Sequence, residues 1–246
     1  MAGVSTGVCL LTTSGQSRLI DSLIDFFEFS SGSITSAKGD SSGNTNGATA
    51  VTGVNGVATD ALSASSSGST GFIQLQQLPS VSNCQSFTIV LFYKNTGANW
   101  PIIWGELGNS TTTLGYRAAY FVNSGNIAKK DSSATSVNYT IPAHTNSTAS
   151  NSFSFLCLNV TTNTYPSQTV SLYSSTGSLL TSSTQNFGMT NIPDPISTTN
   201  WTGALTDSSV IDKVAVFSSN LTSAQITFLY NSGNGRSYSE IQNYAN

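Results

Sequence analysis

The sequence predicts an all-β protein, and three features of the chain support this prediction. Short apolar segments recur along most of the 246 residues, and in them apolar and polar side chains alternate. This period of two is typical of strands with one buried face. Clusters of Gly, Asn and Ser separate the segments, as turns do. Residues 87–93 are apolar on both faces, which indicates a central strand between two layers. Together these features predict a sandwich or a barrel.

The predicted strands run from the first tenth of the chain to its last fifth. Turn clusters at residues 95–97, 123–125 and 174–177 separate several of them. The tract of residues 30–69 is rich in Gly, Ser, Thr and Asn, and it is long for a loop without structure of its own. We expect strands at residues 23–29, 71–75, 87–93, 102–104, 116–122, 153–160, 170–173 and 210–217.

Two segments carry helical signals. Apolar residues at helical spacing predict a short helical turn near residues 17–22, followed by a strand that begins at Leu23. The second signal is a capping box formed by Thr222 and Gln225, which starts a short helix. Gly233 is expected to end this helix. Its apolar side chains are expected to close an open end of the sandwich: Ile226, Leu229 and Tyr230.

Charge is scarce in this chain. Eight Lys and Arg and 11 Asp and Glu make up 8% of the residues and give a net charge of −3. An ordinary soluble domain has about 25% charged residues. The surface is built instead from Ser, Thr and Asn, which number 43, 32 and 22. Without a basic patch, neither nucleic acid nor an anionic membrane is an expected partner. No apolar run approaches the roughly 20 residues of a membrane-spanning helix.

The composition does not divide the chain into domains. Residues 1–18 contain little that builds a secondary-structure element, so they are interpreted as an N-terminal arm, and they lack the pattern of a secretory signal. Residues 19–246 are expected to form a single domain. Cys84 and Cys157 adjoin apolar stretches, which favours buried free thiols. A disulfide between them is the alternative.

The C-terminal part of the sequence resembles a known family. Residues 212–233 combine an Asp that opens a strand, an Asn-Leu-Thr step and a short helix ending in Leu-Tyr-Asn. This is similar to the closing signature of laminin G-like, concanavalin A-like jelly rolls. Residues 40–44 and 53–58 resemble the opening turns of that family, residues 87–94 resemble its central strand, and residues 168–180 resemble its hairpin.

The resemblance covers residues 20–236 and implies an antiparallel jelly-roll β-sandwich with a short C-terminal capping helix. Asp212 is expected to accept hydrogen bonds from turn amides. Members of the family often hold a calcium ion through an Asp and backbone carbonyls, and the candidates here are Asp40, Asp60 and Asp131. None of the three lies in a recognisable calcium loop, so calcium stays open and no metal ligand or cofactor is predicted.

An enzyme is not expected. Glycoside hydrolases of the same fold superfamily carry an acidic triplet on one strand, and retaining enzymes need two carboxyl groups about 5–5.5 Å apart. Here Glu28, Glu106 and Glu240 have no Asp or Glu two residues away. His144 is the only histidine, and it lies in a polar segment without a nucleophile-elbow pattern. The sequence therefore offers no catalytic residue.

A sugar-binding surface would need exposed aromatic rings beside amide or hydroxyl donors. The best cluster in the sequence is Trp100, beside Pro101 at an expected loop edge, together with Tyr116 and Arg117. These three residues are the candidate glycan-binding residues. The alternative is ordinary packing in the core and at the strand edges.

One leading hypothesis and two alternatives follow. Laminin G-like domains occur in bacteriophage structural proteins, so the resemblance implies a non-enzymatic virion protein. It would be a capsid decoration or cement subunit, or a tail or fibre component, that contacts capsid or tail proteins as a homo-oligomer or in many copies. We expect it in the virion after assembly in the host cytoplasm. The alternatives are a lectin-like carbohydrate-binding module and a bacterial surface adhesin, both extracellular and with glycans as possible ligands.

Overall fold

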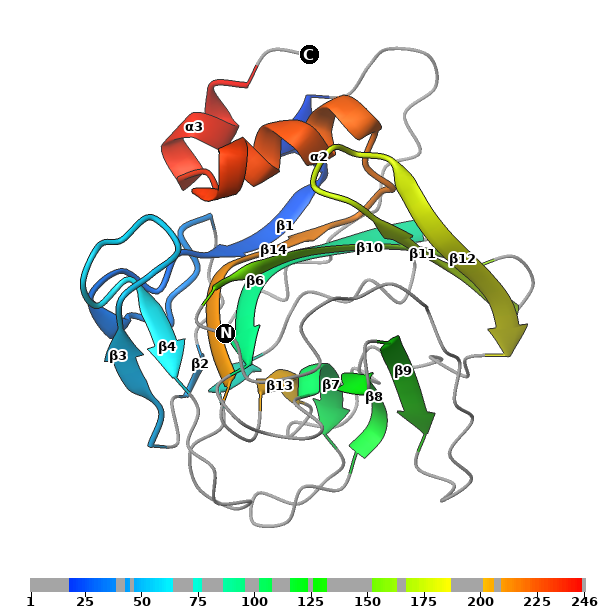
Figure 1. Cartoon of the computed structure of the whole chain (residues 1–246), viewed down its shortest axis with the longest axis horizontal. Helices are drawn as coiled ribbons and strands as arrows, with labels where there is room; N and C mark the ends of the chain where they lie inside the picture. Colours follow the sequence, from blue (N-terminus) through cyan, green and yellow to red (C-terminus); the bar gives the residue numbers. More distant parts are fainter. Residues whose placement is uncertain are drawn as a thin grey trace, which may run out of the picture.

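The structure is a computed structural model, and it describes most but not all of the chain. The described residues are 18–38, 43–44, 47–63, 73–76, 86–95, 102–107, 116–123, 126–131, 152–162, 167–186, 201–205 and 209–244. They confirm the predicted fold class, because two antiparallel sheets make up most of the described chain and the helices are few and short. The fold is an antiparallel jelly-roll β-sandwich (Figure 1).

The larger sheet has eight strands in the described part of the chain. Seven follow the order β12–β11–β10–β6–β14–β4–β3, and β1 pairs with β14 beside β4. The central strand β6 lies between β10 and β14, as the apolar residues on both of its faces predicted. The strands are β1 Leu23–Phe27, β3 Thr49–Val51, β4 Ala61–Ser63, β6 Ser86–Asn95, β10 Ser154–Thr162, β11 Ser167–Tyr173, β12 Leu179–Asn186 and β14 Ser209–Phe217.

The smaller sheet lies opposite one face of the larger sheet (Figure 1). Its order is β2–β5–β13–β7–β8–β9, and its pairs are antiparallel. The strands are β2 Gly43–Asn44, β5 Ile73–Gln76, β7 Ile102–Leu107, β8 Tyr116–Asn123, β9 Asn126–Asp131 and β13 Trp201–Leu205.

The helices lie on the other face of the larger sheet, which we call its outer face (Figure 1). They are α1 Leu19–Ser22, α2 Ser223–Tyr230 and α3 Tyr238–Gln242, and the 3-10 turn η3 Asn231–Gly233 follows α2. Another 3-10 turn, η1 Ser30–Gly32, contacts β3 and β4. We expected the C-terminal helix to close an open end of the sandwich. Instead, α2 covers part of the outer face, because its buried residues Ile226 and Leu229 pack with Val90 and Cys157 of the sheet.

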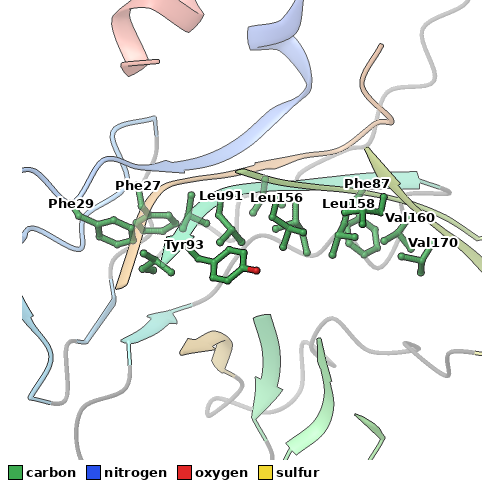
Figure 2. Close-up of a cluster of buried hydrophobic side chains, with 14 of the residues drawn as sticks. Phe27, Phe29, Phe87, Leu91, Tyr93, Leu156, Leu158, Val160 and Val170 are labelled. Atoms are coloured by element: carbon green, nitrogen blue, oxygen red, sulfur yellow. The ribbon is translucent and has the colours of Figure 1, made fainter. Parts of the chain in front are cut away.

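The space between the two sheets is filled from the larger sheet by one apolar cluster. Leu91, Tyr93, Leu156 and Leu158 are each 0% exposed. Figure 2 shows these side chains with Phe27, Phe29, Phe87, Val160 and Val170, all on the face that looks toward the smaller sheet. The next residues along each strand point to the outer face, so the central strands are buried on both sides.

Local sequence signals located several elements correctly. The helical turn before Leu23 is α1, and the capping box of Thr222 and Gln225 starts α2. The expected end of α2 was wrong: Asn231, at φ 49°, takes the left-handed conformation that ends the helix, and Gly233 comes two residues later. The polar tract of residues 30–69 contains η1, β2, β3 and β4. Helix α3 was not predicted, although Ser237 and Glu240 form a capping box at its start.

Candidate functional site

The outer face of the larger sheet has two different halves. Over β14, β6 and part of β10 it is apolar and covered by helices. This helix-side cluster consists of Leu19, Leu23, Phe26, Val90, Cys157, Ala215, Phe217, Leu221, Ile226, Leu229 and Ile241. Over β11 and β12 the outer face carries polar side chains, and the helices that the structure describes do not extend across it (Figure 1).

A buried polar network marks the border between the halves. The Thr88 hydroxyl lies 2.6 Å from Asn159 Oδ1 and 2.8 Å from the Ser219 carbonyl oxygen. Asn159 Nδ2 donates to the Leu221 carbonyl at 3.2 Å. These bonds hold the segment that leads into α2 against the sheet. Just beyond it, Asn220 Nδ2 donates to Thr161 Oγ1 at 2.7 Å.

Strand register shows which side chains share the uncovered half. Thr161 pairs with Thr169 across β10 and β11, and Thr169 pairs with Thr184 across β11 and β12. In the next row, Ser171 lies between Asn159 and Ser182. Directly opposed residues in antiparallel strands point to the same face. We call the set Thr161, Thr169, Ser171, Ser182 and Thr184 the hydroxyl face.

The hydroxyl face is accessible. Ser182 and Thr184 are exposed, whereas Thr161, Thr169 and Ser171 are half-buried between their neighbours. The hydroxyl groups of Thr169 and Thr184 are hydrogen-bonded across the strands at 2.7 Å. Tyr173 continues the same face toward the helices, because it pairs with Cys157 and packs against the helix-side cluster.

The hairpin between β11 and β12 is fixed to the start of α2. Its turn contains Gly177 at φ 73°, and a side chain at this position would lie 2.3 Å from the Ser223 carbonyl oxygen. Only glycine fits such a close approach with this backbone conformation. The Ser223 hydroxyl donates to the Gly177 carbonyl at 2.7 Å. The hydroxyl face is therefore held in a set position relative to the helices.

The chemistry of the hydroxyl face is neutral. Between Asp131 and Asp194 the sequence contains no Asp, Glu, Lys or Arg, and this stretch includes β10, β11 and β12. Each hydroxyl group both donates and accepts hydrogen bonds. Leu179 and Leu180 lie at the start of β12 and are 54% and 47% exposed. The arrangement suits a ligand that is rich in hydroxyl groups and carries apolar C–H patches.

A second polar centre lies at the far end of the outer face, on β14. Asp212 is fully buried, and its Oδ2 accepts a hydrogen bond from the Val54 amide at 2.8 Å. The expectation that Asp212 accepts from a turn amide is confirmed. Gly53 packs so closely that an added side chain would lie 2.7 Å from the same oxygen. The other oxygen, Oδ1, is buried and has no hydrogen-bond partner in the structure.

Burial raises the pKa of Asp212 to about 6, from an ordinary value of 3.8. The Val54 amide and the charge of Lys213 oppose this rise, and the charge of Asp60 adds to it. Lys213 lies 3.6 Å from Glu28, whose Oε1 also accepts from the Tyr238 amide at 3.2 Å. The centre therefore joins the turn at residues 53–60, β14 and the first turn of α3.

The residues that the sequence singled out for glycan binding are only partly placed. Trp100 lies outside the described residues. Tyr116 and Arg117 begin β8, and their side chains lie outside the described part of the structure. The hydroxyl face was not predicted from the sequence, because no single Ser or Thr stands out among so many. The stretch between Asp131 and Asp194 contains no charged residue, and this is the sequence feature that could have located the face.

The remaining predicted residues have ordinary surroundings where they are described. Asp60 Oδ2 accepts from Asn55 Nδ2 at 3.3 Å, Asp40 lies outside the described residues, and Asp131 ends β9. Cys157 is a buried free thiol, and Cys84 lies outside the described residues. Among the described residues, no group of three or more His, Cys, Asp or Glu side chains is arranged to hold a metal ion. Within the same residues, no helix is long and apolar enough to span a membrane.

Comparison with known proteins gives a structural match and no sequence match. No family model matches the sequence, and no curated protein matches it. Botulinum neurotoxin type C, which depends on interaction with two ganglioside molecules to enter cells, matches with a TM-score of 0.55 and 14% identity over 87% of this chain and 52% of that chain. The similarity is one of fold.

Two further matches are binding domains of botulinum neurotoxin DC. The complex with SialylT has a TM-score of 0.54 and 15% identity, over 87% of this chain and 52% of that chain. The complex with rat synaptotagmin II has a TM-score of 0.54 and 15% identity, over 89% of this chain and 56% of that chain. The chain thus spans about half the length of these solved structures.

Proposed function

We propose that this chain is a carbohydrate-binding module and that its hydroxyl face binds uncharged glycans. The observation that carries the proposal is the uncovered half of the larger sheet, where three adjacent strands present hydroxyl groups in register. Sugar hydroxyls exchange neutral hydrogen bonds with such groups, and the ring of Tyr173 offers an apolar surface at the margin.

The neutral character of the site defines the ligand class. An anionic sugar such as sialic acid is normally held by Arg or Lys through charge-assisted hydrogen bonds. No charged residue occurs in β10, β11 or β12. We therefore infer that neutral hexoses or their polymers are preferred over sialylated glycans.

The comparisons support a binding module in general terms. Several of the similar structures are named as binding domains or as a receptor-binding domain. One is named with two ganglioside molecules and another with SialylT. A non-catalytic role for this chain agrees with these names. A carbohydrate-binding module is one of the two alternatives that the sequence suggested beside a virion component.

Glycan binding on the hydroxyl face is tested with two exposed positions on β12. The double variant Ser182→Arg/Thr184→Arg places two long side chains over the face without disturbing buried residues. We expect a neutral glycan found on an array to bind at least about tenfold more weakly to it, as measured by titration calorimetry. The control is Ser239→Arg, an exposed residue of α3. Unchanged binding by the double variant, or no binding of any neutral glycan by the native chain, contradicts the proposal.

The residues predicted from the sequence define a second possible location for the glycan-binding site. If Trp100, Tyr116 and Arg117 form the binding site, Trp100→Ala abolishes glycan binding while Ser182→Arg/Thr184→Arg leaves it intact. If the hydroxyl face forms the site, the opposite result is expected. The two variants together therefore decide between the two locations.

A virion component remains a second candidate, favoured by the neutral surface of β10–β12. In this proposal the laminin G-like domain spans residues 19–246, and residues 1–18 serve as an arm that attaches it to capsid or tail proteins of a phage particle. Neutral contacts depend little on ionic strength, unlike ion pairs. The protein is then expected to remain on purified particles in about 1 M NaCl, and its release by salt would contradict the proposal.

A further inference from the structure

The two edge strands of the larger sheet differ in length. At one end β3 has only three residues, Thr49–Val51. At the other end β12 has eight, Leu179–Asn186, and among the described strands only β11 pairs with it. A strand at the edge of a sheet presents a row of backbone amides and carbonyls that another strand can pair with.

The composition of β12 lacks the charged residues and prolines that often protect such an edge. Natural edge strands are shortened, or they carry Lys, Pro or a bulge that prevents pairing. The sequence of β12 is LLTSSTQN, without charge or proline. Its one irregularity is the register shift opposite Leu172 and Tyr173, near its start, and residues 181–186 pair regularly with β11.

We propose that β12 pairs antiparallel with β12 of a second copy of this chain across a two-fold axis. The two larger sheets then become one continuous sheet. The neutrality of the strand favours its own copy, because the residues next to the two-fold axis meet their counterparts in the second chain, and a charge there would repel itself. Leu179 and Leu180 are two of the three large apolar side chains that are exposed in the described residues. They lie at the start of the strand, where pairing along its full length sets them against the last two residues of the second copy's β12.

Pairing places the hydroxyl faces of the two copies side by side on one sheet. The dimer itself does not depend on glycan binding, since it uses the backbone of β12 and the two leucines. A contact limited to one strand is smaller than a standard protein interface, so the dimer is expected to dissociate on dilution.

The proposal is tested by sedimentation equilibrium of the full chain without any glycan, from about 5 µM to about 1 mM. We expect a monomer–dimer equilibrium in the native chain and a shift of at least about tenfold toward monomer in Leu179→Asp/Leu180→Asp. The matched control is Val57→Asp. It changes the third exposed apolar side chain, which lies in the turn at residues 53–60 and not on β12. This control is expected to dimerise like the native chain.

Hydrogen exchange adds a readout at the strand itself. At high concentration the amides of residues 181–186 should exchange more slowly than at low concentration in the native chain, and equally at both concentrations in the double variant. A chain that stays monomeric up to 1 mM, or a dimer that the double variant leaves unchanged, overturns the proposal. Glycan titration of the monomeric double variant then reports on the proposed function separately.

Discussion

The two halves of the outer face belong to one sheet but differ in their side chains and in what covers them. In the half under the helices, β6, β10 and β14 present Val90, Cys157 and Ala215, which are at most 2% exposed. In the other half, the same strand β10 and its neighbours β11 and β12 present hydroxyl groups to solvent. The strands pair antiparallel on both sides of the border. The difference lies in the side chains and in what covers them, so the covered half supports the fold and the uncovered half is available for binding.

The largest effect is expected in the covered half. Ile226 of α2 is 0% exposed and packs in the helix-side cluster. Ile226→Ala leaves a cavity and should lower the free energy of unfolding by about 2–5 kcal/mol, as measured by urea denaturation. A loss below about 1 kcal/mol would show that α2 is not part of the cooperative core.

The next effect is expected at the border, where Asn159 joins the sheet to the segment before α2. Asn159→Ala leaves the Leu221 carbonyl without its side-chain donor and removes an acceptor near the Thr88 hydroxyl. A buried group that loses its partner costs about 1–3 kcal/mol. The cost is measured by comparing the melting temperature of Asn159→Ala with that of Asn220→Ala, a variant at an exposed neighbouring position. Equal melting temperatures would contradict the border role.

The third effect is a pH dependence of stability. It is expected from Asp212, which lies outside the uncharged hydroxyl face. The pKa of Asp212 in the folded state, about 6, lies above its ordinary value of 3.8, so the folded state binds the proton more tightly. The contribution of Asp212 to stability should therefore be greatest below about pH 4, fall as the pH rises to about 6 and remain constant above it.

Urea denaturation between pH 4 and 7.5 tests this contribution in the native chain and in Asp212→Asn. Asparagine keeps an oxygen that can accept from the Val54 amide, so the variant should lose the pH dependence and keep the fold. The difference between the two curves isolates Asp212 from other groups. Parallel curves would show that Asp212 titrates at its ordinary pKa. The uncharged hydroxyl face should show no change in glycan affinity over the same pH range.

The smallest effect is expected in the uncovered half. Thr184 is exposed, and its hydroxyl group is bonded only to Thr169 in the contacts described above. Thr184→Val keeps the shape and the β-branched side chain, so the free energy of unfolding should change by less than about 0.5 kcal/mol. Glycan affinity, measured by calorimetry, should nevertheless decrease. A stability loss as large as that of Ile226→Ala would mean that the two halves do not differ in purpose.

The sequence predicted the parts of the fold that depend on local patterns. Strand β6 is apolar on both faces, and α2 has a capping box, so neighbouring residues were enough to locate both. Strand β12 is absent from the expected strands because its residues 181–186 are polar on both faces. The hydroxyl face was missed for another reason. Which of the many Ser and Thr residues share a face depends on the register in which three consecutive strands pair. In so uniform a run of Ser and Thr, no residue pattern marks that register.

The contact between Gly177 and Ser223 has a mechanical consequence. A force applied to β12 by an attached ligand would not simply peel the hairpin from the sheet, because the tip of the hairpin is bonded to the first residue of α2. The load passes into the helix and, through Ile226 and Leu229, into the interior of the protein. A larger residue at position 177 would separate the two and leave the hairpin to bear tension alone.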